Sequence, residues 1–488
     1  SSAHAIWGHE RQVYIKPPGE AYREWMQQLG LAFRIKAAFG APDNLILADP
    51  VGITYLLRKR VYDYPHSAIV RPRVARFMGE GLGWVEGEQE HKEMRRLSMP
   101  ALTSDNIRRM SPEIIERAEK VANDLVDSVQ RAGGQDEINI LHWTGKAVLS
   151  IVGRVAFLYD FDSDNNEEGQ KILNARKKSI SQVTRYTGFL ALMLLRRFSI
   201  LNYLPIRAIQ GQSLAKDAIY AGVAQELLSR REENSRNIRA DGAQDLLTIL
   251  YIDLHVSILS LRNGATLVEV TSIAGFETTA TSIAYAVWEL GRHPDKQRRL
   301  REELSALPGE PSMKDMQERL PYLDAVLKET LRLYPALAYM ERVSTTSDII
   351  PLRDPVKLSN GRTTSEILVH PGQTVIIPII AIHRQDDVWK DPDTFRPERW
   401  LEEMPPNDRL NTGWENMLAF SDGPRSCIGT HLAVFNFKIV LSSLVTRFYF
   451  HDAKLSMSLK ISSSLQPWVY RNEQDLGSNE LPVILHAI

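Results

Sequence analysis

The chain contains 488 residues, of which 43% are hydrophobic and 24% are charged, ordinary proportions for a globular protein. Its formal net charge is −1, so bulk electrostatics give no reason to expect a nucleic-acid partner. The single cysteine excludes an intramolecular disulfide and the metal sites that need several thiolates, such as zinc fingers and iron–sulfur clusters. No apolar run reaches the roughly 18 residues of a membrane-spanning helix, because Arg196 and Arg197 follow the most apolar stretch, 188–195.

The N-terminal part of the sequence predicts a short helix followed by strands. We expect a helix over Tyr22–Leu29 and a hairpin made of the strands Phe33–Ala38 and Asn44–Ala48. Asp49–Pro50 is typical of a helix start and predicts a further helix over Val51–Arg60.

The middle of the sequence, from about residue 90 to 304, is mainly helical in pattern. Apolar residues recur at helical spacing in Ser111–Gln130, and a long helix is expected over Leu261–Arg292. The polar segment Asn234–Gln244 predicts a loop, and the highly charged Asp295–Leu304 predicts a solvated helix.

The C-terminal part begins with a predicted helix over Pro321–Leu333 and then changes period. β-Branched residues in Ile367–His383 indicate strands, and Asp391–Asp422 is expected to be a long irregular connection. An apolar helix over Thr430–Phe448 is followed by short strands. The predicted fold class is mainly α with a small β-rich lobe.

The cysteine lies in the segment 420–429, Phe-Ser-Asp-Gly-Pro-Arg-Ser-Cys-Ile-Gly. A lone cysteine is more often a small buried apolar residue than a ligand, so its neighbours decide the interpretation. Gly423, Pro424 and Gly429 allow a tight turn and a close approach of the backbone to a flat group. The amides of a helix starting near Thr430 point at Cys427, which lowers the expected pKa of the thiol and favours the thiolate that an iron ligand must be.

This segment resembles the haem-binding loop of the cytochrome P-450 superfamily, Phe-x-x-Gly-x-Arg-x-Cys-x-Gly, at all of its defined positions. The resemblance implies haem b as the cofactor and a single catalytic domain of the P-450 fold over 1–488, β-rich at about 30–70 and 345–385. It makes Cys427 the axial ligand of the iron, Arg425 a haem-propionate partner, Phe420 a neighbour of the sulfur and Gly429 part of the haem-binding loop. Thiolate ligation pushes electron density toward the iron and favours O–O cleavage.

Glu329 and Arg332 stand three residues apart on one predicted helix face, which by itself is more typical of a surface ion pair. With the following Leu-Tyr-Pro they resemble the Glu-x-x-Arg helix of the P-450 family, and the segment Phe395–Trp400 resembles its next signature. The resemblance implies that Glu329, Arg332 and Arg399 form a buried structural triad, which holds the connection behind the haem loop.

The segment Ala274–Thr279, Ala-Gly-Phe-Glu-Thr-Thr, lies midway along the long predicted helix. Glycine and hydroxyl residues weaken a helix interior, so the segment is either a locally weak turn or a functional opening. It resembles the oxygen-activation motif of the family. The resemblance implies an opened helix over the iron, with Thr278 acting in oxygen activation and Glu277 supplying protons from solvent.

Three more basic residues are candidate haem-propionate partners, with surface bases as the alternative. His91 and Arg95 share a predicted helix face in a segment that resembles the family's Trp-x-x-x-Arg helix, with His91 in the place of Trp. Arg342 follows the Glu-x-x-Arg helix at the spacing that the family uses for another propionate partner.

The resemblance implies a haem-thiolate monooxygenase that inserts one atom of O₂ into a lipophilic molecule such as a terpenoid, a steroid or a fatty compound. Because the sequence has no flavin or NAD signature, the electrons are expected from a separate NADPH–cytochrome reductase. The style of the motifs resembles fungal microsomal members, which implies the cytoplasmic face of the endoplasmic reticulum membrane and an N-terminal anchor that this sequence lacks. A haem-thiolate isomerase or dehydratase and a non-enzymatic haem sensor are the alternatives.

The family also suggests which residues contact the substrate and the reductase, although core packing explains any single apolar residue equally well. The expected substrate contacts are Leu337, Tyr339, Leu465 and Trp468, together with Phe189 and Leu190. The expected basic docking patch for the reductase consists of Lys92, Arg96, His431 and Lys438.

Overall fold

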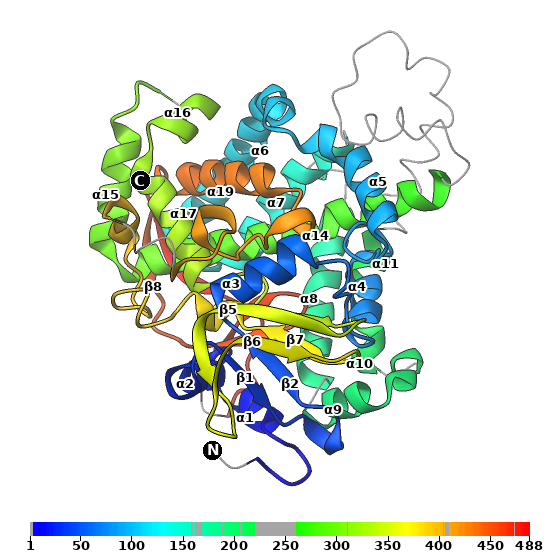
Figure 1. Ribbon diagram of the computed structural model, residues 1–488. Coiled ribbons are helices and arrows are strands. Elements are labelled where there is room, and N and C mark those ends of the chain that lie inside the picture. The colour runs from blue at the N-terminus through cyan, green and yellow to red at the C-terminus, as the bar shows by residue number, and fades with distance from the viewer. Residues whose placement is uncertain are drawn as a thin grey trace.

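The computed structural model describes residues 3–157, 160–161, 168–186, 189–204, 207–219, 260–309, 311–403, 405, 409–472 and 474–488. Most helices gather in one large lobe and most strands in a smaller one (Figure 1). This is the mainly α architecture with a β-rich lobe that the sequence predicts. Within the described residues, no helix combines the length and the apolar character needed to cross a lipid bilayer. The expected loop at Asn234–Gln244 lies outside the described residues.

The elements have the following bounds. The α-helices are α1 (Glu10–Ile15), α2 (Glu20–Leu29), α3 (Pro50–Thr54), α4 (Val70–Met78), α5 (Glu88–Ser98), α6 (Ser104–Arg131), α7 (Ile140–Phe157), α8 (Glu168–Tyr186), α9 (Phe189–Arg197), α10 (Arg207–Gln210), α11 (Leu214–Ile219), α14 (Ser260–Arg292), α15 (Pro294–Ser305), α16 (Met313–Glu318), α17 (Pro321–Leu333), α18 (Ile379–Ile382) and α19 (Thr430–Val445). The strands are β1 (Ala32–Ile35), β2 (Asn44–Leu47), β3 (Gln135–Asn139), β4 (Met340–Val343), β5 (Asp348–Lys357), β6 (Thr363–Val369), β7 (Thr374–Ile377), β8 (Phe448–Asp452), β9 (Ser456–Ile461), β10 (Leu465–Tyr470) and β11 (Pro482–Ala487). Short helical turns are η1 (Ala38–Gly40), η2 (Tyr55–Lys59), η3 (Met99–Leu102), η4 (Ser199–Tyr203), η6 (Pro397–Leu401), η8 (Trp414–Asn416) and η9 (Gly423–Arg425).

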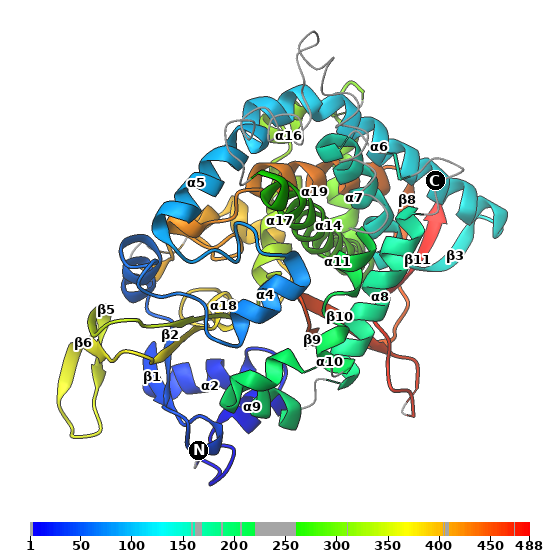
Figure 2. The same cartoon turned by 90° about the vertical axis from the view of Figure 1, so that its right-hand side faces the viewer.

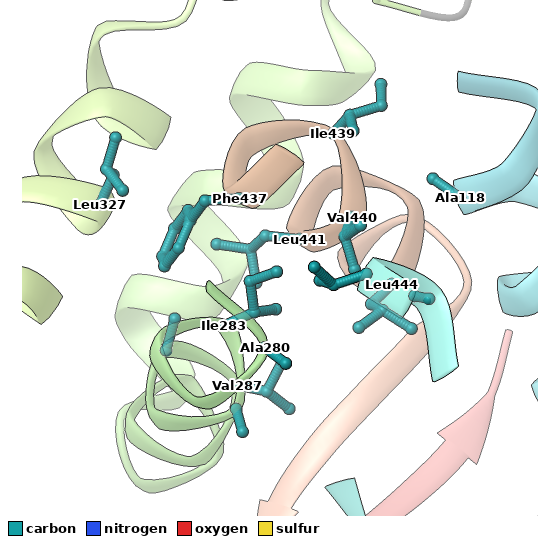
Figure 3. Packing of buried hydrophobic residues seen from close by; sticks show 14 of the residues in the cluster. Ala118, Ala280, Ile283, Val287, Leu327, Phe437, Ile439, Val440, Leu441 and Leu444 are labelled. Atoms are coloured by element: carbon teal, nitrogen blue, oxygen red, sulfur yellow. The ribbon is translucent and has the colours of Figure 1, made fainter. Parts of the chain in front are cut away.

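The helical core forms where α19 packs on α14. Ala280 and Ile283 of α14 and Leu441 of α19 are fully buried, and their side chains meet between the two helices (Figure 3). Their spacing of three to four residues keeps apolar side chains on one helix face. This contact matters for the site because α19 starts just after Cys427 and α14 carries Glu277 and Thr278.

The main sheet of the β-rich lobe has the strand order β1-β2-β7-β4. β1 and β2 are antiparallel, as the predicted hairpin requires, and β2 then runs parallel to β7. β4 returns antiparallel to β7 and places Arg342 opposite Val375. One of the predicted cofactor partners is therefore held by a strand of the smaller lobe.

A second sheet joins distant parts of the chain, because β11, near the C-terminus, lies between β3 and β8. Ile484 pairs with Glu137 on one side and with His451 on the other. Sequence analysis predicted short strands in the tail but not β3, whose residues Gln-Asp-Glu-Ile-Asn are mostly polar and become a strand through this pairing.

The predicted helices Tyr22–Leu29 and Pro321–Leu333 are confirmed as α2 and α17, and the long helices as α6 and α14. The strand predicted over Phe33–Ala38 is too long, since β1 ends at Ile35. The Lys36 carbonyl instead accepts a hydrogen bond from the His9 amide, and the Ala38 amide donates to Glu10. The N-terminal segment therefore takes up the groups that would have extended the strand.

Two other predictions are wrong in part. Within Ile367–His383 the strands end at Ile377, and the chain turns into the short buried helix α18 after Pro378. The helix α15 is not solvated on all sides, because Gln297, Leu300 and Leu304 are buried. The Gln297 side chain bonds the backbone of Phe450 in both directions, which fastens α15 to β8.

Candidate active site

The cysteine loop is a tight turn placed between η2 and α19. The Cys427 amide donates to the Phe420 carbonyl at 2.9 Å, and the Ser426 amide donates to the Gly423 carbonyl at 3.0 Å. Gly423 has φ = +68°, and a Cβ atom there would lie 2.2 Å from the carbonyl oxygen of Leu57. Only glycine fits this position, so the Gly-Pro turn of the motif has a structural cause.

The Cys427 side chain is exposed, yet burial by the surrounding protein raises the pKa of its thiol. A thiol that solvent can reach although protein atoms surround it must face a space that the protein encloses. Hydrogen bonds from the Gly429 amide and the Thr430 side chain, and the charge of Arg95, lower the pKa but do not outweigh burial. The expectation of a lowered thiol pKa is therefore wrong for the protein alone, because desolvation exceeds the effect of the helix end.

Arginines from three different parts of the chain surround this loop. Arg95 of α5 donates to the Ser426 carbonyl at 2.7 Å. Arg425 donates to the Glu86 carbonyl at 2.9 Å and lies 3.6 Å from the Glu86 carboxylate. Arg342 of β4 is buried, and burial lowers the pKa of its guanidinium to about 10.

Several buried polar atoms of this cluster have no hydrogen-bond partner within the described residues. They are Nε and Nη1 of Arg342, Nε of Arg425 and Oε2 of Glu86. The other oxygen of Glu86 is engaged by His66, whose Nδ1 lies 2.6 Å away. Arg342 and Arg425 thus share the carboxylate of Glu86 among the described residues, which leaves an excess of positive charge in a desolvated place.

His91 lies on α5 beside the same cluster and is buried. Its Nδ1 is 3.0 Å from the Tyr62 hydroxyl, which is its one side-chain hydrogen bond within the described residues. Burial, helped by the charges of Arg425 and Arg95, lowers the pKa of His91 to about 4. His91 is therefore neutral at neutral pH and can serve a ligand as a hydrogen-bond donor, not as a cation.

Phe420 and Gly429 complete the predicted loop residues. The Phe420 ring packs edge-to-face on Trp414, with 5.0 Å between the ring centroids. A Cβ atom built on Gly429 meets no protein atom within 4 Å, and the backbone there has φ = −89°. Neither backbone strain nor protein packing requires this glycine, so the space beside it is open for a group that is not protein.

Glu329, Arg332 and Arg399 come together as the sequence predicts, and all three are buried. Arg332 donates to both carboxylate oxygens of Glu329 at 2.9 and 2.8 Å, and Arg399 Nε lies 3.0 Å from Oε1. Burial acts to raise the pKa of Glu329, but the hydrogen bond and charge of Arg332 and the charge of Arg399 lower it overall. The carboxylate is therefore held ionised in the core.

The two arginines of this triad also hold the irregular connection that follows α18. Arg332 donates to the carbonyls of His383 and Pro392, at 2.9 and 2.7 Å. Arg399 donates to the carbonyls of Lys390 and Asp391, at 2.6 and 3.1 Å. A segment with few hydrogen bonds of its own is thus satisfied by two buried guanidinium groups.

Thr278 is half-buried on α14, and its hydroxyl donates to the Ala274 carbonyl at 2.8 Å. α14 runs through this segment without a break, so the expected opening of the helix is absent. The physical reason is that a threonine hydroxyl can bond the carbonyl four residues earlier without unwinding the helix.

Glu277 is buried and does not face solvent as the sequence suggested. Ser463 and Ser464 donate to its Oε1, the latter at 2.8 Å, and Arg176 of α8 forms an ion pair with its Oε2 at 3.7 Å. The carboxylate therefore joins α14 to α8 and to the turn before β10. Sequence analysis missed Arg176, because a single arginine in an ordinary amphipathic helix gives no local signal.

The residues proposed to contact substrate separate into two groups. Leu337 is 52% exposed, so its side chain is free to meet a ligand. The hydroxyl of Tyr339 instead accepts a hydrogen bond from the Gly19 amide at 2.8 Å, and its ring packs on Tyr22. Tyr339 fastens helix α2 through its hydroxyl, while its side chain is half-buried, and its contact with substrate stays a prediction.

Leu465 and Trp468 are also buried, and both are occupied by other contacts. The Leu465 amide donates to the Ala336 carbonyl, and the Trp468 Nε1 donates to the Leu476 carbonyl at 3.1 Å. Phe189 stacks its ring edge against Trp7 at 5.1 Å, so it covers the N-terminal segment. Leu190 is exposed. Among the expected contacts, Leu337 and Leu190 are the two with exposed side chains.

The predicted docking patch is only partly basic. Lys438 is buried and bonds Asp324 at 2.6 Å, so it cannot meet a partner protein, and its assignment is wrong. Lys92 and Arg96 are exposed on α5 but pair with Glu88 at 2.7 Å and Glu93 at 3.7 Å. This face of α5 is balanced in charge, and His431 is the other exposed base of the predicted patch.

Comparison with known proteins agrees with this geometry. The sequence model of the cytochrome P450 family matches residues 2–469. The chain is 30% identical over 441 residues to cytochrome P450 monooxygenase claQ of Ampulloclitocybe clavipes, covering 89% of this chain and 82% of the relative. It is also 30% identical over 505 residues to cytochrome P450 monooxygenase 205 of Postia placenta, covering 98% and 90%.

The chain therefore belongs to the cytochrome P450 family, and the mainly α architecture described above is consistent with the fold of that family. These relatives are named monooxygenases, and the chain is an enzyme of that class. Membership of the family implies a haem-iron cofactor.

The residues near Cys427 fit such a group. A haem carries two carboxylates at one edge, and the unpartnered nitrogens of Arg342 and Arg425 are suited to bind them. The guanidinium groups outnumber the carboxylate of Glu86, so the cluster has the positive charge that attracts the anionic propionates. The accessible sulfur of Cys427 and the open space at Gly429 leave room for a flat group beside the loop.

Glu329→Gln should destabilise the protein strongly, because it leaves Arg332 and Arg399 buried without their counter-charge. The expected loss is about 3–5 kcal/mol in the free energy of unfolding, measured by urea titration. Glu318→Gln, in an exposed ion pair on α16, is the matched control and should change stability by less than about 0.5 kcal/mol. Equal effects of the two substitutions would contradict a structural role for the triad.

His91 should make folding sensitive to acid. Its pKa is about 4 in the folded chain, against an ordinary value of 6.5. Between these pH values the unfolded chain binds a proton at His91 that the folded chain does not. The contribution of His91 to the free energy of unfolding is therefore fully present above pH 6.5 and is lost as the pH falls toward 4.

Acidification from neutral pH to pH 4 should therefore destabilise haem-free His91→Gln less than the haem-free wild type. The difference in the loss of unfolding free energy should be up to about 3 kcal/mol. Urea titrations at a series of pH values measure this difference. His370→Gln, at an exposed position, is the control. A slope against pH that is unchanged in His91→Gln refutes the assignment.

Proposed function

We propose that this protein is a haem b monooxygenase that hydroxylates a lipophilic small molecule, such as a terpenoid, a steroid or a fatty compound. A C–H bond of the substrate becomes C–O–H, with one atom of O₂ in the product and the other in water. The reaction takes two protons and two electrons, and the electrons come from a separate NADPH-dependent reductase. The observation that carries the proposal is the accessible thiol of Cys427 in an enclosed, arginine-lined place.

The chain's own residues position the components of this reaction. When bound, the haem supplies the redox chemistry that activates O₂. The Gly429 amide and Arg95 stabilise a thiolate at Cys427, while His91, Arg95, Arg342 and Arg425 hold the propionates. Thr278 offers a hydroxyl on α14, and the carboxylate of Glu277 next to it accepts hydrogen bonds from the hydroxyls of Ser463 and Ser464. The exposed apolar side chain of Leu337 favours a lipophilic substrate.

The spectrum of the reduced, CO-bound protein tests the thiolate assignment. The wild-type protein should give the Soret band at the long wavelength typical of a thiolate ligand, and Cys427→Ala should lose it. Persistence of that band in Cys427→Ala, or its absence from haem-loaded wild type, would sink the assignment.

Incubation with a lipophilic acceptor, NADPH, a reductase and isotopically labelled O₂ then tests the reaction itself. One labelled oxygen atom should enter the product, and Thr278→Val should divert electrons to hydrogen peroxide. A product without the label that forms without electrons would instead identify an isomerase or dehydratase.

We also propose that the protein binds the cytoplasmic face of the endoplasmic reticulum membrane through an apolar surface, which we call the N-terminal apolar face. It consists of the exposed residues Ile6, Tyr14, Ile15, Leu190, Phe198, Ile200, Tyr203 and Leu204. Trp7 and Tyr14 both contact the ring of Phe189, which joins the two segments, and Figure 2 shows α9 beside the N-terminal region. Exposed apolar groups in such number, beside the exposed Arg11 and Arg197, favour an anionic lipid surface.

Replacing Phe198, Ile200 and Tyr203 together by Ser should lower co-sedimentation with vesicles of anionic phospholipid by about tenfold, because each lost apolar side chain contributes to binding. Ile349→Ser with Leu368→Ser, at exposed positions of the β5–β6 hairpin, is the matched control. If both variants bind vesicles as well as the wild type, the membrane proposal is wrong.

A further inference from the structure

Arg73 of α4 is a charged group that the proposed reaction does not use. Its side chain is half-buried, and burial by the surrounding protein lowers the pKa of its guanidinium. It makes one hydrogen bond, from Nη2 to the Ser462 carbonyl at 3.2 Å, and it lies over the ring of Phe77 at 5.9 Å. Among the described residues it makes no other hydrogen bond and no ion pair, so its Nε and Nη1 donate to no protein acceptor.

The carboxylates closest to Arg73 are already engaged. Glu341 attracts its charge, but Glu341 forms an ion pair with Arg196, which also pairs with Glu10. Arg196 in turn repels Arg73. Among the described residues, the one carboxylate that acts on Arg73 is therefore already paired with another arginine.

A second arginine on the same helix adds to the positive charge. Arg76 follows Arg73 by one turn and is bound by neutral groups, the Gln212 side chain at 2.6 Å and the Asn202 carbonyl at 3.1 Å. Burial, helped by the charge of Arg73, lowers the pKa of Arg76 to about 10. Like charges one turn apart destabilise a helix unless an anion lies between or near them.

The position of Arg73 connects it with the candidate active site. Its partner Ser462 begins the turn whose next two residues, Ser463 and Ser464, bind Glu277 beside Thr278. The following amide, of Leu465, donates to the Ala336 carbonyl next to Leu337. One turn of the chain thus contacts α4, α14 and the loop that carries the exposed Leu337, so Arg73 lies on the substrate side of the site.

An unpaired guanidinium in a desolvated place is costly, and natural proteins keep such groups where a ligand supplies the missing charge. The planar fork of arginine matches a carboxylate, which can accept two parallel hydrogen bonds. The bond to Ser462 uses one N–H of Nη2, so the second N–H of Nη2 can pair with Nε or with Nη1 in that geometry.

We propose that Arg73 binds a carboxylate of the substrate, so that the lipophilic molecule oxidised by this enzyme is an acid. This inference rests on the proposed monooxygenase function. It names Arg73 as a specificity-determining residue, with Leu337 contacting the apolar part of the same molecule. The ester or alcohol that corresponds to the acid would lack the ion pair and bind more weakly.

The shift of the resting Soret band on titration of the haem-loaded protein measures this preference. The probes are dodecanoic acid with 1-dodecanol, and a diterpene carboxylic acid with the matching alcohol. Wild type should bind at least one acid about tenfold more tightly than its alcohol, since charge-assisted hydrogen bonds contribute more than neutral ones. Arg73→Gln should remove this preference and leave the affinity for the alcohol within about twofold, and Arg73→Lys should restore part of it.

Arg362→Gln, at an exposed position between β5 and β6, is the control. It should leave the ratio of acid to alcohol affinity unchanged. A wild-type protein that binds no acid more tightly than its alcohol overturns the proposal, as does an unchanged ratio in Arg73→Gln. The thiolate-type CO spectrum is checked in every variant, so a failure of haem ligation is distinguished from a failure of acid recognition.

Discussion

The buried carboxylate of Glu329 is the interaction on which the geometry of the site depends. It holds Arg332 and Arg399 in the core, and those guanidinium groups take the backbone carbonyls of the irregular connection after α18. His383, whose carbonyl Arg332 binds, accepts the Leu418 amide at its own Nε2 at 2.9 Å. Two residues further on, the Phe420 carbonyl receives the Cys427 amide. A continuous series of hydrogen bonds therefore runs from an ion pair in α17 to the backbone of the proposed ligand.

Two groups of arginines carry positive charge that the carboxylates of the described residues around them do not fully neutralise. Around Cys427, Arg342 and Arg425 share the carboxylate of Glu86, and Arg95 lies on the other side of the loop residue Ser426 without a carboxylate partner among the described residues. On helix α4, Arg73 and Arg76 donate only to neutral acceptors among the described residues. Burying such charges destabilises the folded protein unless a counter-charge offsets the loss of hydration. Both sets are accounted for if the protein binds anionic groups, the propionates of its cofactor in the first case and the substrate in the second.

The environment of Glu277 shows a different use of burial. Its carboxylate is paired with Arg176 and receives the hydroxyls of Ser463 and Ser464, so it joins α8, α14 and the turn before β10. The same turn binds Arg73 through Ser462. A change in the protonation or pairing of Glu277 therefore acts directly on the elements that surround the substrate side of the site.

The sequence by itself determined the features whose causes are local. Pro and Gly fixed the helix bounds of α17 and the turn before Cys427, and the short spacing within Glu329–Arg332 and Phe420–Gly429 carried the family resemblance. These patterns predict chemistry because a few residues of backbone decide where their side chains go.

The tertiary structure alone decided which polar groups are desolvated and what they bind. Tyr339 bonds Gly19 across 320 positions, Lys438 is buried against Asp324, and β3 becomes a strand only beside β11. The raised thiol pKa of Cys427 and the unpaired Arg73 likewise depend on protein packed around them from distant segments. Spacing along the chain cannot report such contacts, because burial and electrostatics depend on distances in space, not on positions in sequence.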